Sequence, residues 1–482
     1  MSSLVAVHEL RNLVGGELVD AVDGATREIL NPANGDVIGR VPEGTEADVE
    51  RAMAAARNAR IGWRDTTPAQ RQEALLALAD AVDRHAGELA ALEIANVGKP
   101  RSLADEELPI CSDELRFFAG AARVQNAPAA GEYSPTHTSF IRREPVGIVG
   151  QIAPWNYPLM MAIWKIAPAL ATGNVVVLKP SEITPLSTLK LAELAAEIFP
   201  PGVLNVITGE GDPVGRGIVT HRDVALVSLT GSVPTGKWIA KAAADSLKRV
   251  HLELGGKAPV VVLDDADPAK VAAGLRVASF CNSGQDCTAA ARVLATPSIY
   301  DALLEALVPA AASLTVGDPA EGDAIEMGPV VSAAQQQRVL GFLDRAVDGG
   351  ANLLLGGSTG RDGGYFVEPT VVTGVGQDAE IVQQEIFGPV VTVQRVADED
   401  EAIRFANDVP YGLAASIWTR DVGKALNGVR ALDFGCVWVN DHLPFLSEMP
   451  HGGFKESGYG KDLSTYALDD YTRIKHAMIS LD

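Results

Sequence analysis

Cys287 is the residue of this chain whose type and setting most directly suggest chemistry. It lies in the run FCNSGQDCTAAAR, directly after Asp286 and before the small residues 288–291. We expect a helix to begin at this cysteine, where unpaired backbone N–H groups and the helix dipole would stabilise a thiolate. A thiolate can attack a carbonyl carbon. A free cysteine by itself is more often a small buried side chain, so the assignment depends on partners elsewhere.

Two polar residues in strand-like segments are candidate partners of the thiol. Glu253 lies inside the apolar run RVHLELGG, where burial would raise its pKa and suit it to act as a general base. The alternative is a buried ion pair with Lys257. Asn156, in PWNYP directly after a strand, could donate an amide N–H to the oxyanion that forms when the thiolate attacks an aldehyde; the alternative is an ordinary turn.

The run KPSE, residues 179–182, ends a predicted strand and carries groups that suit a ribose. Glu182 can accept hydrogen bonds from both hydroxyls of an adenosine ribose, and Lys179 can donate to the same sugar. The carboxylate would also repel a ribose 2′-phosphate. The predicted cofactor is therefore NAD rather than NADP.

Three further segments could hold the rest of a dinucleotide. Gly211 and Gly215, in GEGDPVG, resemble the dinucleotide fingerprint with one residue inserted, which is a weak signal. Ser232 opens a predicted helix and offers a hydroxyl to a phosphate. In EIFGP, Glu385 could hold a second ribose and Phe387 could pack on a nicotinamide ring. Each residue by itself could be a helix cap, a turn residue or a core aromatic. These ordinary roles do not explain why all of them occur together in one chain.

The elements that must position these residues form two alternating series. From residue 146, the strand-like runs VGIVGQIA, NVVVLKP, GVLNVIT, VALVSLTG and RVHLELGG alternate with helical segments. A second series starts at APVVVLDD, residues 258–265, and continues through RVLAT, PVVTVQRV, AASIWT and CVWVN. The pattern predicts an α/β fold with parallel sheets covered by helices, and ligands at the carboxyl ends of the strands. Ahead of both series, residues 46–95 have helical periodicity.

Composition excludes several classes of protein. A chain of 482 residues predicts two or three domains, and its formal charge of −22 argues against nucleic-acid binding. No apolar run reaches the length of a membrane span, and the N-terminal residues do not read as a secretory signal. Four scattered cysteines read as thiols of a cytoplasmic protein. Without a CxxC pair or clustered histidines, no metal site is predicted.

In this order and spacing, the motifs resemble the aldehyde dehydrogenase family. The match runs from residue 31 to the end of the chain and includes PWNYP, KPSE, LTGS, ELGGK, GQDC, EIFGPV and HGGFKESGYGKD. The resemblance implies three parts: an NAD domain of Rossmann-like type (1–124 and 145–252), a catalytic domain (253–448), and strands for oligomerisation (125–144 and 463–482). The last two segments have the alternating apolar positions of half-exposed strands. A homodimer or homotetramer is expected.

The roles of the family carry over to matching residues. The resemblance implies Cys287 as nucleophile, Glu253 as base, and Asn156 with the backbone N–H of Cys287 as oxyanion donors. Thiolate attack would give a thiohemiacetal, hydride transfer to NAD a thioester, and hydrolysis a carboxylic acid. The predicted cofactor-binding residues are Ile152, Trp155, Lys179, Ser181, Glu182, Gly211, Gly215, Ser232, Leu254, Glu385 and Phe387.

A narrower resemblance is to the dehydrogenases of 4-aminobutanal within this family. It is carried by HTSFIRREPVG, SGQDCTAAAR, SEMPHGGFKESGYGKD and the closing LDDYT. A protonated amino aldehyde needs acidic groups near the substrate tunnel, and Asp286, Glu107 and Asp113 are the candidates. Glu107 and Asp113 could equally lie on the solvated face of a helix. The predicted reaction oxidises 4-aminobutanal to 4-aminobutanoate, as in putrescine degradation.

Other functions stay open at this point. Betaine aldehyde, another amino aldehyde or a neutral aliphatic aldehyde are alternative substrates. A carboxylated aldehyde would need an arginine in the tunnel. A protein that kept the fold and lost the chemistry is disfavoured because Cys287, Glu253 and Asn156 are all present, and a papain-like thiol hydrolase because no histidine has a matching context.

Overall fold

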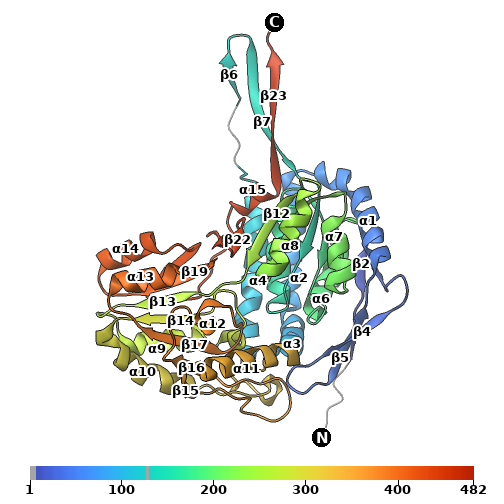
Figure 1. Cartoon of the computed structure of the whole chain (residues 1–482). Helices are drawn as coiled ribbons and strands as arrows, with labels where there is room; N and C mark the ends of the chain where they lie inside the picture. Colours follow the sequence, from blue (N-terminus) through green and yellow to red (C-terminus); the bar gives the residue numbers. More distant parts are fainter. Residues whose placement is uncertain (1–6, 126–129) are drawn as a thin grey trace.

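The structure is a computed structural model of the 482-residue chain, and it describes residues 7–125 and 130–482. Residues 1–6 of the predicted NAD domain and 126–129 of the predicted oligomerisation strands lie outside the described residues. The predicted α/β fold with parallel sheets is confirmed. Figure 1 shows two α/β bodies side by side, with a long narrow sheet projecting from one of them.

The first body is built on an eight-stranded sheet. Its strand order is β22-β12-β11-β8-β9-β10-β2-β3, and the five strands from β12 to β10 are mutually parallel. The strands are β2 (Asn12–Val14), β3 (Glu17–Val19), β8 (Ile148–Ile152), β9 (Val175–Lys179), β10 (Leu204–Val206), β11 (Val224–Gly231), β12 (Arg249–Leu254) and β22 (Gly458–Tyr459). Their apolar runs form strands because helices cover both faces of the sheet.

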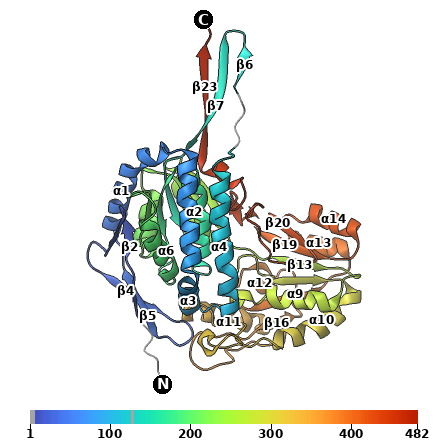
Figure 2. The ribbon, with the colours of Figure 1, turned by 180° about the vertical axis from the view of Figure 1, so that it is seen from behind.

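Helices pack on this sheet in layers. On one face lie α1 (Glu46–Arg64), α7 (Arg216–Thr220) and α8 (Val233–Ala244), and on the other α5 (Pro158–Ala171) and α6 (Leu186–Ala196). An outer layer of three helices covers α5 and α6: α2 (Pro68–Arg84), α3 (Ala86–Val97) and α4 (Arg101–Ala121). Figure 2, turned by 180°, shows this layer at the front. Every residue of α5 is buried, because α5 lies between the sheet and this outer layer.

The second body has a seven-stranded sheet of order β15-β16-β17-β14-β13-β19-β20, parallel except between β15 and β16. Its strands are β13 (Pro259–Val262), β14 (Arg292–Ala295), β15 (Asn352–Leu355), β16 (Thr370–Thr373), β17 (Val390–Arg395), β19 (Ala414–Trp418) and β20 (Cys436–Val439). Its helices are α9 (Pro268–Ala278), α10 (Pro297–Ala312), α11 (Ala333–Asp348), α12 (Glu380–Gln383), α13 (Glu399–Asn407) and α14 (Val422–Ala431).

The projecting sheet joins two segments that are far apart in the sequence. Strand β7 (His137–Pro145) pairs with β23 (Thr472–Ser480) on one side and β6 (Gly131–Ser134) on the other. In Figures 1 and 2 this sheet, called the flap below, stands clear of both bodies, as the alternating pattern of its residues predicted.

Short elements complete the structure. They are β1 (His8–Glu9), β4 (Thr26–Leu30), β5 (Val37–Pro42), β18 (Tyr411–Gly412), β21 (Phe454–Lys455), α15 (Ala467–Asp470), a π-turn η1 (Gly211–Gly215) and the 3₁₀ turns η2 (Cys281–Gly284) and η3 (Pro319–Glu321). Among the helices of residues 7–125 and 130–482, none has the length and apolar composition needed to cross a bilayer. The domain division stays a prediction; strand β12 runs through its boundary between residues 252 and 253.

The helix predicted to begin at Cys287 is wrong. The chain turns at Cys287 and Thr288 and then enters β14 without a helix. The backbone N–H groups of Ala290 and Ala291 donate to the carbonyl oxygens of Ala278 and Ala258, at 3.0 and 3.2 Å. These tertiary hydrogen bonds replace the local ones that a helix would need, so the preference of small residues for a helix is overridden.

Candidate active site

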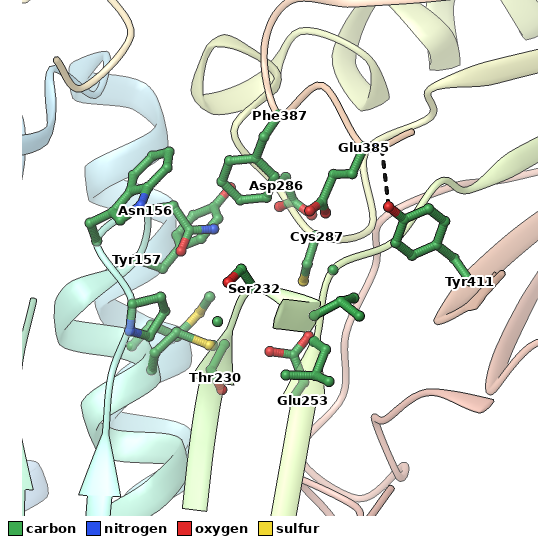
Figure 3. A pocket seen from close by; sticks show the side chains of 18 of the residues that line it. Asn156, Tyr157, Thr230, Ser232, Glu253, Asp286, Cys287, Glu385, Phe387 and Tyr411 are labelled. Atoms are coloured by element: carbon green, nitrogen blue, oxygen red, sulfur yellow. Dashed lines mark hydrogen bonds between the residues drawn. The ribbon is translucent and has the colours of Figure 1, made fainter. Parts of the chain in front are cut away.

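A cavity of about 490 Å³ lies between the two bodies, at the carboxyl ends of β8, β11 and β12. In Figure 3, Cys287 lies near its centre, with Asn156 and Tyr157 on one side and Glu385 and Tyr411 on the other. The predicted site residues that line it are Trp155, Asn156, Ser232, Glu253, Leu254, Asp286, Cys287, Glu385 and Phe387. The structure therefore brings together residues that are up to 232 positions apart (387 − 155).

The loop that carries Cys287 has an unusual backbone. Asn282, Ser283 and Gly284 adopt positive φ angles of 48°, 57° and 68°. At Gly284 a side chain would also collide with the backbone, because its Cβ would lie 2.2 Å from the carbonyl oxygen of Gly388. The tight turn explains why the motif before the nucleophile contains a glycine at this position.

The environment of Cys287 favours the protonated thiol. Burial raises the pKa of this thiol well above its ordinary value, and the carboxylates of Glu253 and Asp286 raise it further. A helix dipole to offset them is missing, since the predicted helix does not form. A thiol in this setting can attack a carbonyl only after a base has taken its proton.

Glu253 is the penultimate residue of strand β12 and is 1% exposed. Within the described residues, neither of its carboxylate oxygens has a hydrogen-bond partner. Lys257 is not its partner either: that ammonium is buried without a hydrogen bond to a described residue, and burial lowers its pKa to about 7. The alternative of a structural ion pair with Lys257 is thus wrong, and the carboxylate is free to accept a proton in the cavity.

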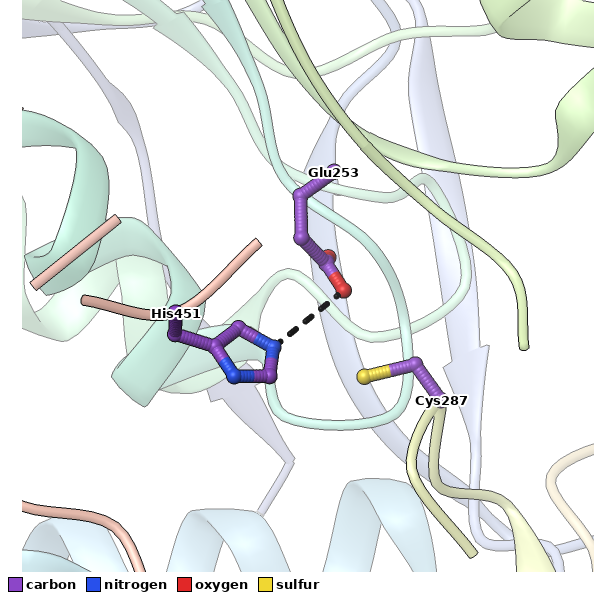
Figure 4. A group of neighbouring side chains, drawn as sticks. All are labelled: Glu253, Cys287 and His451. Atoms are coloured by element: carbon purple, nitrogen blue, oxygen red, sulfur yellow. Dashed lines mark ion pairs between the residues drawn. The ribbon is translucent and has the colours of Figure 1, made fainter. Parts of the chain in front are cut away.

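His451 completes the group around the nucleophile and was not predicted from the sequence. Its Nε2 lies 3.8 Å from Oε1 of Glu253, and its ring packs edge-on against Trp164 and Phe445. Figure 4 shows the imidazole, the carboxylate and the thiol converging from three segments. The segment of His451 is held by paired backbone hydrogen bonds with Asp462. In the sequence, only the MPHGGF run could have drawn attention to this histidine. No sequence pattern predicts that it lies near Cys287.

Asn156 is buried and connects the PWNYP turn to the cysteine loop. Its side-chain Nδ2 donates to the backbone carbonyl oxygen of Gln285 at 3.0 Å. The backbone carbonyl oxygen of Asn156 accepts from Nδ2 of Asn282 at 2.9 Å. One of the two amide hydrogens is thereby used to position the side chain. The other amide hydrogen is not used by this hydrogen bond.

Glu385 and Phe387 form a further part of the cavity wall. An oxygen of Glu385 accepts a hydrogen bond from the backbone N–H of Gly256 at 2.9 Å, and burial raises its pKa to about 7. A Cβ at Gly255 would lie 2.3 Å from this carboxylate, so glycine is required there. Phe387 packs edge-on against Trp155 with ring centroids 5.1 Å apart.

Two hydroxyl groups line the same cavity near the end of β11. Ser232 caps α8, and its side chain accepts from the backbone N–H of Thr235. The hydroxyl of Thr230 is buried and has no hydrogen-bond partner among the residues that the structure describes. The N-terminus of α8 and these hydroxyls suit the phosphates of a dinucleotide.

The remaining predicted cofactor residues are not among those that line this cavity, and most of them are neighbours. Nζ of Lys179 donates to Glu182 at 3.1 Å. A Cβ on Gly215 would contact the side chains of Lys179 and Ile152 at 3.6 and 3.9 Å, so these three residues are neighbours. Ser181 is buried in the same turn as Glu182, whereas Gly211 is exposed at the start of η1.

The acidic residues predicted to meet the substrate have different environments. Asp286 lines the cavity and accepts hydrogen bonds from the N–H and the hydroxyl of Thr288, both at 2.7 Å. Glu107 does not line the cavity. It is buried against the ammonium of Lys99, which also binds Glu93, so no substrate contact is proposed for it.

A second cavity of about 230 Å³ adjoins the first and shares Trp164 and Phe445 with it. Asp113, Glu114 and Glu448 line it. Glu114 is fully buried, and neither of its oxygens has a hydrogen bond to a described residue. Ser447 lies close by but donates its hydrogen to Asp113, at 2.6 Å. Burial raises the pKa of Glu114 well above its usual range.

Within residues 7–125 and 130–482, one group of side chains could hold a metal ion. Ligand atoms of Glu253, Cys287 and His451 lie within 4.8 Å of one another. The sequence predicted no metal site because it has no CxxC pair and no clustered histidines, and these three residues come from separate segments.

Comparison with known proteins identifies the family. Residues 19–477 match the model of the aldehyde dehydrogenase family. An aldehyde dehydrogenase of Emericella nidulans is 43% identical over 96% of this chain and 93% of its own length, and a betaine aldehyde dehydrogenase of Bacillus subtilis is 39% identical over 96% of each. The betaine aldehyde dehydrogenase of Staphylococcus aureus in complex with NAD+ superposes with a TM-score of 0.96 at 40% identity, covering 98% of this chain and 95% of that one. The chain belongs to the aldehyde dehydrogenase family.

Proposed function

We propose that this protein is an NAD-dependent dehydrogenase that oxidises a cationic amino aldehyde, 4-aminobutanal in the first place, to its carboxylic acid. The observation that carries the chemistry is the cavity in which Cys287 and Glu253 lie within 4.8 Å of each other, with no hydrogen bond from a described residue to the Glu253 carboxylate. Glu253 takes the thiol proton, and the sulfur attacks the aldehyde carbon. The oxyanion is stabilised by the free amide hydrogen of Asn156 and the backbone N–H of Cys287.

The residues present fit NAD. Lys179 and Glu182 would hold the adenosine ribose, Ser232 a phosphate, and Glu385 the second ribose, with Phe387 against the nicotinamide ring. The relatives from Staphylococcus aureus and Bacillus cereus with 40% identity were solved as NAD+ complexes. When bound, NAD supplies the hydride acceptor. Glu253 passes the thiol proton on to solvent and is again a carboxylate. It then holds the water that hydrolyses the acylated Cys287 and takes the proton of that water.

Negative charge along the cavities supports a cationic substrate. Asp286 lies next to the nucleophile, and Asp113, Glu114 and Glu448 line the adjoining cavity. Burial disfavours the charged form of Glu114, and an ammonium group bound near it would favour the carboxylate. The primary ammonium of 4-aminobutanal can donate hydrogen bonds to these carboxylates.

Betaine aldehyde is the second candidate. The wall shared by the two cavities is aromatic, with Trp164 edge-on to Phe445 at 5.8 Å between ring centroids. Aromatic faces bind quaternary ammonium groups, which have no N–H to donate. Relatives from Bacillus subtilis and Staphylococcus aureus are named betaine aldehyde dehydrogenases.

A steady-state survey separates these candidates. We expect the highest kcat/KM for 4-aminobutanal with NAD, a lower value for betaine aldehyde, and lower values still for butanal and for succinate semialdehyde. NADP should be a poorer cofactor because Glu182 repels its 2′-phosphate. The Cys287→Ser variant is the blank and should lose about 1,000-fold or more in kcat. Best turnover of the anionic aldehyde would contradict the proposed substrate class.

Charge recognition is tested with Asp286→Asn, which removes the charge and keeps an oxygen for the bonds to Thr288. We expect KM for 4-aminobutanal to rise about tenfold while KM for butanal stays unchanged, since one charge interaction of about 1.4 kcal/mol is lost. Glu114→Gln should act in the same direction. Asp105→Asn, on the exposed side of α4, is the matched control. An equal rise for both aldehydes would mean that Asp286 acts on the loop and not on the charge.

A further inference from the structure

We propose that Cys287, Glu253 and His451 form a binding site for a zinc-class divalent cation, which reversibly blocks the nucleophile. The thiol sulfur, a carboxylate oxygen and an imidazole nitrogen lie within 4.8 Å of one another. They come from the loop after η2, the end of β12 and the segment before β21, so only the folded chain assembles them. Figure 4 shows the three groups facing the same point.

Two of the three groups lack the hydrogen bonds that buried polar atoms usually make. Both oxygens of Glu253 and Nε2 of His451 have no hydrogen-bond partner among the described residues, and both side chains are buried. The 3.8 Å between Oε1 and Nε2 is too long for a hydrogen bond. A cation between the carboxylate and the imidazole would interact favourably with both groups at once. A water molecule in the same place would compensate their burial less well.

The donor set selects the class of metal. Thiolate sulfur, imidazole nitrogen and carboxylate oxygen are the ligands of zinc and similar transition metals, whereas magnesium and calcium prefer oxygen ligands only. Tetrahedral zinc places neighbouring ligand atoms about 3.5 Å apart, so side-chain rotations that move atoms by about 1 Å would close this group. Three protein ligands leave the fourth position toward the cavity, open to water.

Metal binding would switch the site off. The thiol loses its proton to the buffer, the sulfur donates its electron pair to the cation, and no redox change occurs. Cys287 then cannot attack a carbonyl, and Glu253 cannot take a proton. A chelator removes the cation and restores the thiol, so the block is reversible.

The test uses the full-length enzyme without aldehyde and without NAD, titrated with Co²⁺. We expect one equivalent to bind with a near-ultraviolet thiolate-to-cobalt band, and Zn²⁺ to displace it. His451→Phe keeps the aromatic packing against Trp164 and should weaken binding by about tenfold or more. Cys287→Ser should abolish the band. The controls Cys436→Ser and His476→Ala remove a cysteine and a histidine elsewhere and should leave band and affinity unchanged.

Three results would overturn the proposal: no band in the wild type, unchanged affinity in His451→Phe, or loss of the band in Cys436→Ser. Glu253→Gln removes a different ligand and decides the matter if His451→Phe does not fold. Because neither aldehyde nor NAD is present, these results are independent of the substrate survey. A protein that binds no metal could still be the proposed dehydrogenase.

Discussion

The protonation of the proposed nucleophile, Cys287, depends on its burial and on two nearby carboxylates. Burial and the carboxylates of Glu253 and Asp286 all raise the pKa of the Cys287 thiol. The same carboxylate that disfavours the thiolate is the base that can remove the proton. Since the thiolate is the form that reacts, the raised pKa makes Cys287 less reactive toward alkylating agents and oxidants.

The pKa of Cys287 can be measured through alkylation by iodoacetamide. Only the thiolate reacts, so below the raised pKa the rate should increase about tenfold per pH unit from about pH 6.5 to 8.5. Glu253→Gln removes the largest raising charge and should increase the rate several-fold at a fixed pH. A plateau near pH 7 would show instead that the pKa is lowered, as a helix N-terminus would have done.

At the scale of elements, buried charges tie the outer helices to the cavity wall. Lys99, between α3 and α4, binds Glu93 and Glu107, and its ammonium lies 4.4 Å from the ring centroid of Tyr157 on the cavity wall. Glu93 also accepts from the N–H of Leu159 in α5. This network joins three helices and positions one wall of the site.

Lys99→Met should destabilise the protein strongly. It leaves the carboxylates of Glu93 and Glu107 buried without a cation, which costs about 3–5 kcal/mol and can be measured by urea unfolding. The loss should shrink toward lower pH, where the unpaired carboxyl groups take up protons. Arg101→Met is the control, because the pair of Arg101 with Asp323 is exposed and contributes at most about 1 kcal/mol. Equal destabilisation by both substitutions would contradict this view of the network.

At the scale of the whole molecule, the flap is the part that has no core of its own. Ile474 and Met478 share one face of β23 and are 63% and 53% exposed, although apolar. Exposed apolar residues on a projecting sheet indicate a contact with another copy of the chain. We propose that the flap builds a homodimer or homotetramer.

Ile474→Asp combined with Met478→Asp should lower the oligomeric state, as measured by sedimentation velocity at matched protein concentrations. Charged groups on this face would have to be desolvated in the interface, whereas they are solvated in the separate chain. Leu247→Asp is the matched control, since Leu247 is 92% exposed on the body of the protein. An unchanged sedimentation profile of the double variant would exclude this face as an interface.

Local pattern was sufficient to predict the sheets and the segments that carry the motifs. The apolar runs of β8, β9 and β11 could only form buried strands, and Glu253 stood out because a carboxylate in such a run needs a reason. Local pattern failed at 288–291, where hydrogen bonds to Ala258 and Ala278 outweigh helix propensity. It also failed at Glu107, because the pairing with Lys99 depends on how α3 and α4 turn toward each other.

The sequence by itself determined the family, the order of the elements and the candidate for the nucleophile, because these depend on residue types at fixed spacings. Only the tertiary structure decided what surrounds that nucleophile. The approach of His451 to Glu253 and the unpartnered carboxylate of Glu114 arise from contacts between distant segments. Such contacts depend on packing in three dimensions, which no local periodicity encodes.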